Sequence, residues 1–384
     1  MITPFMYKCY YIKLIMKKAI VIYPVLENLD KNLIENKLIE TCNLAEAIYL
    51  DVIHKEYFKL NKPDPKALMR KGKVNYFLEL FNDFNFKGND SILIFAIDIS
   101  PIQQRNLEKI YKIKILDKTS LILEIFGERA FSKIGRIQVE LAHLSWQKSR
   151  LVRSWTHLER QRGGFGFLGG PGESQIELDK RMINKRIKQL KFLILKAKKT
   201  REIQYNNRQK KRVPVVSLLG YTNAGKSTLF NSLTKLKVSA KNKLFETLDT
   251  KISYFYLPLT KKAYINDTVG FISDLPTLLV EAFKSTLDEV TKADLLIHVR
   301  DISISNHEEQ KTDVLNVLKQ LNIIPNTIEG PPMIEVINKV DVSNAESKNF
   351  FKNKKNTFLI SAKTGEGIES LKNGIDKILH SFSV

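Results

Sequence analysis

The sequence GYTNAGKST at Gly220–Thr228 decides the fold of the second half of this chain. It completes an apolar run, PVVSLLG, and has the spacing G-x-x-x-x-G-K-[ST], in which glycines let backbone N–H groups wrap around phosphates. A helix that opens there adds the positive end of its dipole. In this frame Lys226 reaches the β and γ phosphates and Ser227 offers a hydroxyl to Mg²⁺. A chance glycine turn is the alternative interpretation.

Three further motifs follow in order, each at the end of an apolar run. DTVG at Asp267–Gly270 places a carboxylate near Mg²⁺, through water, and a backbone N–H near the γ-phosphate. NKVD at Asn338–Asp341 offers the Asp341 carboxylate to the N1 and N2 donors of guanine, with Asn338 at the opposite edge. Adenine would leave that carboxylate unpaired. SAK at Ser361–Lys363 offers backbone N–H groups to the guanine O6, so the four motifs together predict a GTP site.

The stretch LFETLDT contains the candidate switch threonine, Thr247, with Thr250 as its competitor. Thr247 and Ser227 are the candidate Mg²⁺ ligands, and only Lys226 and Thr247 have a candidate role in catalysis. Phe271 follows the DTVG glycine and cannot orient the attacking water as glutamine would, so we expect slow hydrolysis until a partner orders the switch segments. The candidate GTP-binding residues are Gly220, Tyr221, Thr222, Asn223, Ala224, Gly225, Lys226, Ser227, Phe245, Glu246, Thr247, Leu248, Asp249, Asp267, Thr268, Val269, Gly270, Asn338, Lys339, Val340, Asp341, Ser361, Ala362 and Lys363.

The composition bounds the class of protein. At 384 residues the chain is long enough for two or three domains, and its 62 Lys and Arg against 41 Asp and Glu give a net charge of +21, which favours an anionic partner. Only Cys9 and Cys42 are present, without CxxC spacing, which argues against disulfide scaffolds and cysteine zinc sites. The N-terminal apolar stretch is interrupted by lysines and is too short for a membrane span. We interpret residues 1–17 as an extension, disordered or an upstream mis-start.

Residues 18–128 alternate strand-like and helix-like patterns, which predicts an α/β domain with a mostly parallel sheet. Ser100 is a candidate helix N-cap with Pro101 at the first helical position. Residues 213–384 show a second such alternation, in which runs with few polar residues, SYFYLPL among them, suit strands buried on both faces of a parallel sheet.

Residues 129–212 show two helical patterns on either side of a glycine cluster, GGFGFLGGPGE at 163–173. Their heptad-like spacing predicts two helices packed antiparallel as a hairpin, the second about 50 Å long if it has roughly 35 residues. The seam residues are Ile137, Leu141, Leu144, Leu151, Trp155 and Leu158 before the cluster and Ile176, Ile183, Ile187, Leu190, Ile194 and Ala197 after it.

The glycine cluster also fits the G-x-G-x-x-G spacing of a dinucleotide-binding turn, at Gly164, Gly166 and Gly169. A helix and not a strand precedes it, and no acidic residue follows about 20 residues later, which argues against that interpretation.

From its first predicted strand onward the chain resembles the HflX family of bacterial ribosome-binding, ribosome-splitting GTPases. The resemblance rests on SPIQQRNLEKI at Ser100–Ile110, QVELAHL at Gln138–Leu144 and RLVRSWTHLERQRGGFGFLGGPGESQIELD at Arg150–Asp179, and GYTNAGKST, LFETLD and DTVGFI agree with it. Phe271 is usual in that family. Two features depart from it: MRKGKV has Arg70 where the family's GKGK has its first glycine, and the chain ends one helix after SAK, whereas some members carry a further C-terminal domain.

The resemblance implies an N-terminal α/β domain (18–128), a long antiparallel helical hairpin (129–212) with a glycine-rich tip (163–173), and a Ras-like P-loop GTPase domain (213–384). It implies a GTP hydrolase with Mg²⁺ that binds the 50S ribosomal subunit and its rRNA, the tip near the peptidyl-transferase centre, and dissociates stalled 70S ribosomes. We expect a cytoplasmic, ribosome-associated monomer without stable membrane insertion. A large-subunit assembly factor without splitting activity is the alternative, and a GTPase that binds anionic lipid surfaces is a third.

The second helix and the tip are the candidate RNA-binding parts. Between Ser174 and Val213 there are 14 Lys and Arg against 3 Asp and Glu, a net charge of +11, which suits an RNA backbone. Glycines permit close approach at the tip, and Phe165 and Phe167 offer faces to unstacked bases. A solvated charged helix that ends in a turn is the alternative. The candidate RNA contacts are Gly163, Gly164, Phe165, Gly166, Phe167, Gly169 and Gly170.

Overall fold

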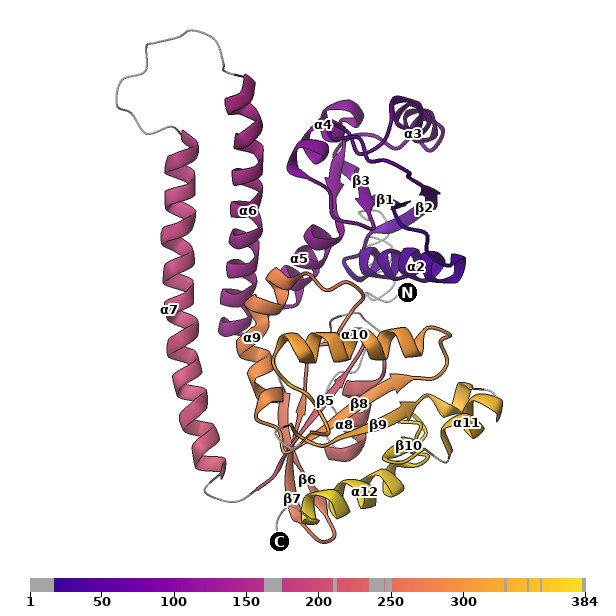
Figure 1. Ribbon diagram of the computed structural model, residues 1–384, viewed down its shortest axis with the longest axis vertical. Helices are drawn as coiled ribbons and strands as arrows, with labels where there is room; N and C mark the ends of the chain where they lie inside the picture. The colour runs from indigo at the N-terminus through magenta and orange to yellow at the C-terminus, as the bar shows by residue number, and fades with distance from the viewer. Residues whose placement is uncertain are drawn as a thin grey trace, which may run out of the picture. The chain divides into compact units, whose positions relative to one another are not determined.

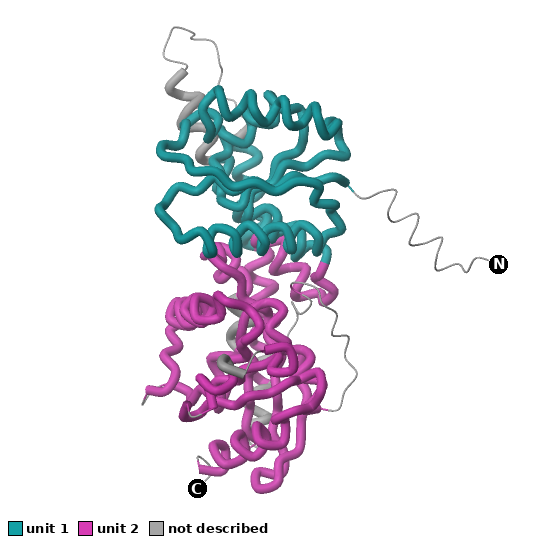
Figure 2. The backbone as a smooth tube through the Cα atoms, turned by 90° about the vertical axis from the view of Figure 1, so that its right-hand side faces the viewer, with its two compact units in different colours: residues 1–128, 143–188 teal, residues 129–142, 189–384 magenta. Residues whose placement is uncertain are grey.

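The computed structural model (Figure 1) describes residues 17–161, 175–209, 213–234, 245, 251–327, 330–343, 345–352 and 354–381. Contacts within the chain define two compact units, residues 1–128 with 143–188 and residues 129–142 with 189–384 (Figure 2). The two longest helices therefore each belong partly to both units. This division into two units does not test the three segments that the sequence predicts, residues 18–128, 129–212 and 213–384. Those segment boundaries stay a prediction.

The first unit contains a four-stranded parallel sheet in the order β2-β1-β3-β4, which confirms the predicted α/β arrangement. Ser100 caps helix α4 as predicted. The Ser100 hydroxyl accepts from the Gln103 N–H at 3.2 Å, and the Gln103 side chain accepts from the Ser100 N–H at 2.9 Å. The elements are β1 (Lys18–Val25), α2 (Lys31–Ala47), β2 (Asp51–Lys59), α3 (Lys71–Asp83), η1 (Gly88–Asp90), β3 (Ser91–Phe95), α4 (Pro101–Tyr111), β4 (Lys114–Leu116) and α5 (Lys118–Arg129).

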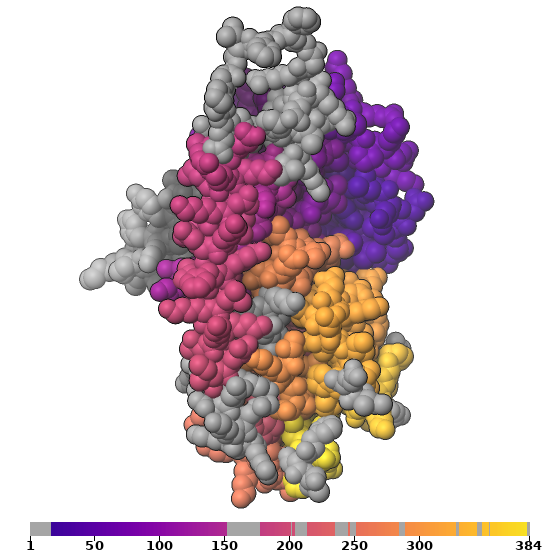
Figure 3. Space-filling model, turned by 60° about the vertical axis from the view of Figure 1, so that its left-hand side comes forward, coloured from indigo at the N-terminus to yellow at the C-terminus, as the bar shows by residue number. Residues whose placement is uncertain are grey.

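Two long helices, α6 (Lys133–Gln161) and α7 (Gln175–Gln209), lie side by side (Figure 1). They run antiparallel because one chain segment joins their neighbouring ends. The predicted seam of α7 is borne out from Ile183 to Ala197, where the seam residues are buried or half-buried and most of the others are exposed. Figure 3 shows α7 at the surface. The glycine-rich tip lies outside the described residues.

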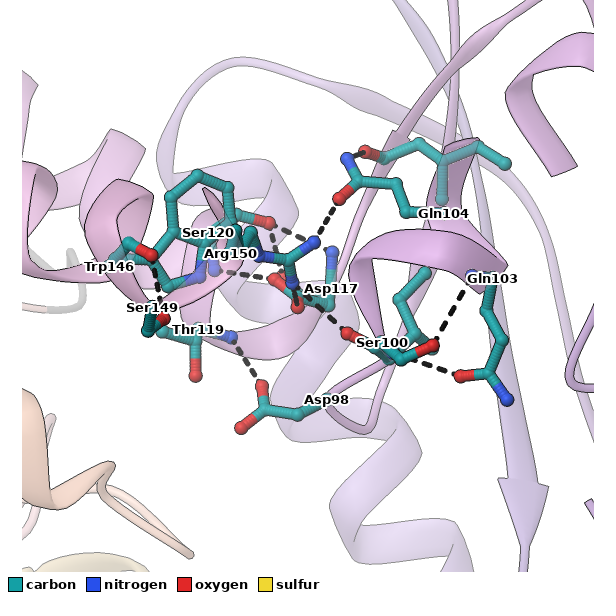
Figure 4. Close-up of polar contacts among 12 residues, drawn as sticks. Asp98, Ser100, Gln103, Gln104, Asp117, Thr119, Ser120, Trp146, Ser149 and Arg150 are labelled. Carbon is teal, nitrogen blue, oxygen red and sulfur yellow. Dashed lines mark hydrogen bonds and ion pairs between the residues drawn. The ribbon is translucent and has the colours of Figure 1, made fainter. Parts of the chain in front are cut away.

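Arg150 of α6 joins that helix to the parallel sheet of its unit (Figure 4). Its guanidinium donates to the Asp117 carboxylate, to the Gln104 side-chain oxygen and, at 3.1 Å, to the Ile99 carbonyl, and it lies 4.2 Å from the centre of the Trp146 ring. The Asp117 side chain is 1% exposed. Burial raises the pKa of Asp117, and the Arg150 charge opposes that shift. Arg150, the first residue of the stretch RLVRSW, therefore contacts Gln104, which belongs to the stretch SPIQQ.

The second unit contains a six-stranded sheet in the order β10-β9-β8-β5-β7-β6. All neighbouring strands pair in parallel except β6 and β7, which are antiparallel. The elements are β5 (Val215–Gly220), α8 (Lys226–Thr234), β6 (Lys251–Leu257), β7 (Lys261–Asp267), α9 (Thr277–Thr291), β8 (Leu295–Asp301), α10 (His307–Gln320), β9 (Met333–Asn338), η2 (Val340–Val342), α11 (Ala345–Lys352), β10 (Thr357–Leu359) and α12 (Ile368–Ser381). Strands and helices alternate as expected for a P-loop GTPase domain.

Strand β6 differs from the prediction of burial on both faces. It is the edge strand, and its residues alternate: Phe255 and Leu257 are buried, whereas Tyr254 and Tyr256 are exposed. The prediction is wrong here because tyrosine, phenylalanine and leucine all count as apolar, which hides the period-two alternation of a half-buried antiparallel strand. None of the described helices is long and apolar enough to cross a membrane.

Replacing Arg150 by alanine is expected to destabilise the first unit by about 3 to 5 kcal/mol, because the buried Asp117 carboxylate loses its cationic partner. The two tryptophans of the chain, Trp146 and Trp155, both belong to α6, so urea unfolding followed by tryptophan fluorescence reports on this helix. Arg105→Ala removes an exposed arginine of α4 and should change the free energy of unfolding by less than about 0.5 kcal/mol. Equal midpoints for Arg150→Ala and the unaltered protein would show that this contact does not hold α6.

Candidate nucleotide-binding site

The loop between β5 and α8 requires glycine at both ends. Gly220 has φ +143° and Gly225 has φ +92°, conformations that side chains disfavour. A Cβ at Gly220 would lie 2.2 Å from the Val299 carbonyl oxygen, and a Cβ at Gly225 would lie 2.2 Å from Nδ2 of Asn338. The strand, glycine loop and helix thus occur in the order that the sequence motif predicts.

Lys226, the first residue of α8, is buried within this loop. Its Nζ donates to the carbonyl oxygens of Gly220 at 3.0 Å and Tyr221 at 2.7 Å. Burial lowers the pKa of Lys226 to about 8, and the negative charge of Asp267 acts in the opposite direction. The Lys226 ammonium group therefore donates to two uncharged carbonyl oxygens of the loop, at the position where the sequence motif predicts phosphate binding.

Ser227, in the first turn of α8, lies beside Asp267, the last residue of β7. The Ser227 hydroxyl donates to Oδ2 of Asp267 at 2.7 Å, and Asp267 is fully buried. The Thr268 hydroxyl donates to the Leu218 carbonyl at 2.6 Å and fixes the start of the DTVG segment. A hydroxyl and a carboxylate are hard oxygen donors, which Mg²⁺ accepts together with phosphate oxygens and water. Within the described ranges no group of three or more His, Cys, Asp or Glu could hold a metal ion.

The DTVG segment is hydrogen-bonded to the glycine loop. The Phe271 N–H donates to the Gly220 carbonyl at 3.1 Å, and the Thr222 N–H donates to the Phe271 carbonyl at 2.7 Å. A Cβ at Gly270 would lie 2.8 Å from Cγ2 of Thr222 and 3.1 Å from Nζ of Lys226, so only glycine fits here without displacement. A shift in the position of one segment would therefore move the other directly.

The Phe271 ring is a core residue. It is 2% exposed and belongs to a hydrophobic cluster to which α9 and α10 contribute, with Val280 and Val314 among its members. The side chain at this position therefore points into the core. That Phe271 takes no part in orienting water stays a prediction.

Asn338 links three of the predicted motifs. Its Nδ2 donates to the Ala224 carbonyl at 2.8 Å, and its Oδ1 accepts from the Ala362 N–H at 2.9 Å. The side chain is 2% exposed. These bonds use groups that the sequence assigned to the base, the Asn338 amide and one N–H of the SAK motif. A contact of either group with guanine stays a prediction.

The other candidate residues take simple positions. Asp341 is exposed, with its carboxylate accessible, and Lys339 has φ +66° and an Nζ 2.6 Å from Oδ2 of Asp301. The Ser361 hydroxyl accepts from the Thr364 N–H at 3.1 Å. Asn223 and Lys363 are exposed, and Tyr221, Phe245, Val269 and Val340 are buried. Glu246, Thr247, Leu248 and Asp249 lie outside the described residues, as do Thr250 and the candidate RNA contacts Gly163, Gly164, Phe165, Gly166, Phe167, Gly169 and Gly170.

Sequence analysis missed one contact of the site. The Tyr221 hydroxyl donates to Oδ2 of Asp313, at 3.0 Å, and so joins the glycine loop to α10. The two residues are 92 positions apart, and nothing in the stretch HEEQKTDVLNVLKQ distinguishes Asp313 from the other polar residues of an amphipathic helix.

Comparison with known proteins finds similar chains. Residues 35–127 match the family described as GTP-binding GTPase N-terminal, residues 129–208 the GTP-binding GTPase Middle Region, and residues 215–339 the 50S ribosome-binding GTPase. A protein of Magnetococcus marinus named GTPase HflX is 42% identical over 359 residues, which are 92% of this chain and 80% of the relative. The GTPase HflX of Escherichia coli strain K12 is 41% identical over 312 residues, 80% of this chain and 71% of the relative. A crystal structure of SsGBP with GDP covers 96% of this chain and 100% of that chain, at 23% identity and a TM-score of 0.49.

Replacing Gly225 by alanine is expected to weaken binding of a fluorescent GDP analogue about tenfold or more, because the new Cβ meets Asn338 and the loop cannot keep its left-handed conformation. Gly72→Ala in α3 is the matched control, since a Cβ there meets nothing within 4 Å. Circular dichroism of both variants shows whether they fold. An unchanged affinity in Gly225→Ala would mean that the nucleotide does not bind this loop.

Replacing Phe271 by glutamine is expected to destabilise the protein by about 3 kcal/mol or more and to leave GTP hydrolysis without a partner no faster, because the amide would be buried without hydrogen bonds. Thermal unfolding and phosphate release in a single turnover measure the two effects. Phe271→Leu keeps an apolar side chain and should retain most of the stability. Faster hydrolysis in Phe271→Gln at unchanged stability would contradict this description of the site.

Proposed function

This chain belongs to the HflX family of GTPases and hydrolyses GTP, and from that premise we propose that it binds the large ribosomal subunit and separates stalled 70S ribosomes into their subunits. The observation that carries the proposal is the combination of a nucleotide loop with a long, exposed basic helix in one chain. Of the residues of α7 between Lys180 and Lys199, most are exposed and many are Lys or Arg. Such a surface suits the phosphates of rRNA.

In this proposal GTP binds with its phosphates in the loop between β5 and α8. Lys226 would contact the β and γ phosphates, Ser227 and Thr247 would hold Mg²⁺, and Asp267 would contact it through water. When bound there, Mg²⁺ would neutralise charge on the β and γ phosphates. The exposed Asp341 carboxylate would accept from guanine. The glycine loop, the buried lysine and the Ser227–Asp267 hydrogen bond support these assignments.

Hydrolysis would depend on a partner. Phe271 lies in the hydrophobic core, so the attacking water has to be ordered by other groups, in the switch segment around Thr247 or in the ribosome. GTP binding would favour the ribosome-bound state that parts the subunits, and hydrolysis would release the protein. GTP therefore sets the time that the protein spends on the ribosome.

The nucleotide state would reach the arm, which is the helical hairpin of residues 129–212, through contacts near the first residues of α6. The Gln138 side chain donates to the Ala282 carbonyl of α9 at 3.2 Å, and α9 follows the DTVG segment in the chain. Because α6 and α7 each contribute to both compact units, a shift of α9 would act on the arm through continuous helices. The arm would carry its tip, residues 163–173, to rRNA.

Sucrose-gradient sedimentation of 70S ribosomes with the protein and a non-hydrolysable GTP analogue tests the proposal. We expect the 70S peak to fall while the 30S and 50S peaks rise. Gly225→Ala, which should bind nucleotide about tenfold or more weakly, is the control and should leave the 70S peak unchanged when the analogue is kept below the dissociation constant of the variant. A 70S peak that persists with the unaltered protein would contradict the splitting activity. Co-sedimentation with immature 50S particles, with 70S intact, would instead favour a subunit-assembly factor.

A further inference from the structure

The antiparallel ribbon formed by β6 and β7 carries aromatic side chains on its outward face. Tyr254 lies opposite Tyr264, and Tyr256 lies opposite Lys262. Side chains two positions apart on a strand share a face, so these four residues project to the same side. Phe255, between the two tyrosines of β6, points the other way into the hydrophobic core. The ribbon is therefore apolar inside and aromatic outside.

The outward tyrosines of β6 are accessible and lie close together. Tyr256 is 70% exposed and Tyr254 is 46% exposed. Their ring centres are 5.7 Å apart in an edge-to-face arrangement, and Nζ of Lys262 lies 4.1 Å from the centre of the Tyr254 ring. A pair of exposed aromatic rings beside a fixed ammonium group offers both stacking surface and positive charge.

The charge of the ribbon has one sign. Lys262 lies on the outward face, whereas Lys251 and Lys261 begin β6 and β7 and have the inward alternation of Phe255 and Leu257. No Asp or Glu occurs between Lys251 and Asn266. The acidic residue that follows, Asp267, is fully buried in the nucleotide site. Charge complementarity therefore favours an anionic ligand at this face.

We propose that the outward face of the β6–β7 ribbon binds unpaired RNA. Bases stack on Tyr254 and Tyr256, and Lys262 contacts a phosphate. Sheet faces that combine aromatic rings with nearby cations bind single-stranded RNA in this way, since every base has a face that can stack. A protein partner would also use the exposed Ile252, but it would not need the Lys262 ammonium beside the Tyr254 ring in a stretch without an acidic residue. This site contains none of the glycine-rich tip and does not depend on the proposed splitting of ribosomes.

Photo-crosslinking of the full chain to a short oligouridine that contains 4-thiouridine tests the place of binding. Trypsin cleaves after Lys251 and Lys261, so both tyrosines of β6 fall in one peptide, residues 252–261. We expect crosslinked uridine on this peptide. Crosslinks found only on other peptides, such as those of α7, would overturn the proposal.

Fluorescence anisotropy of the same oligouridine tests the stacking. The double variant Tyr254→Ala with Tyr256→Ala should bind about fivefold or more weakly, whereas the double change to phenylalanine keeps the rings and should bind as before. Lys262→Gln should reduce the slope of log affinity against log salt by about 0.7. Binding of a fluorescent GDP analogue should be unchanged in all three, which shows that they fold.

The matched control is Phe350→Ala on α11. Phe350 is 63% exposed and also lies under a lysine, with Nζ of Lys354 at 3.9 Å from the ring centre. Equal losses in this control and in the tyrosine variant, or an unchanged affinity in the double alanine variant, would overturn the proposal. So would a tyrosine variant that binds the oligouridine normally but no longer binds 50S subunits, since that result would identify a protein partner. Failure of ribosome splitting with intact oligouridine binding would count against the proposed function alone.

Discussion

The nucleotide site depends on the hydrogen bonds of the Asn338 side-chain amide. One amide group donates to the glycine loop and accepts from the SAK motif, so three segments that are far apart in the chain share one anchor. The same amide sets the need for glycine at position 225, because no Cβ fits beside it. The loop in turn fixes the buried Lys226, and its backbone pairs with the segment that ends at Phe271. A buried, fully bonded amide of this kind specifies one arrangement of its neighbours, since any other arrangement leaves a polar group unpaired.

Two side chains of α6, at different points along the helix, make hydrogen bonds to other elements. Near its first residues, Gln138 bonds to α9 in the unit that contains the nucleotide loop. Farther along, Arg150 bonds to Asp117 and to α4 in the unit that contains the parallel sheet. Both attachments use buried or half-buried polar groups, which tolerate little sliding because each bond is directional. Each part of the helix is thus held at a specific point within its own unit.

Much of this could be predicted from the sequence because it is local. The cap at Ser100, the glycine loop before Lys226 and the seam of α7 each depend on residues a few positions apart, whose spacing fixes their geometry. The hydrogen bonds of Arg150 and Asn338 could not be predicted, because their partners are 24 to 114 positions away and depend on how the elements pack. The exposed face of β6 was missed for another reason. Tyrosine has both an apolar ring and a polar hydroxyl, so an alternation of tyrosine with phenylalanine or leucine does not reveal which face meets water.

The position of Phe271 in the core has an evolutionary consequence. A side chain that both fills the core and adjoins the phosphate loop cannot be exchanged to change the hydrolysis rate without a loss of stability. Selection for a longer or shorter GTP-bound lifetime would therefore act on surface residues and on the docking partner, where substitutions are tolerated. Under the proposed function, the lifetime of the GTP-bound state would then be set by the assembled complex.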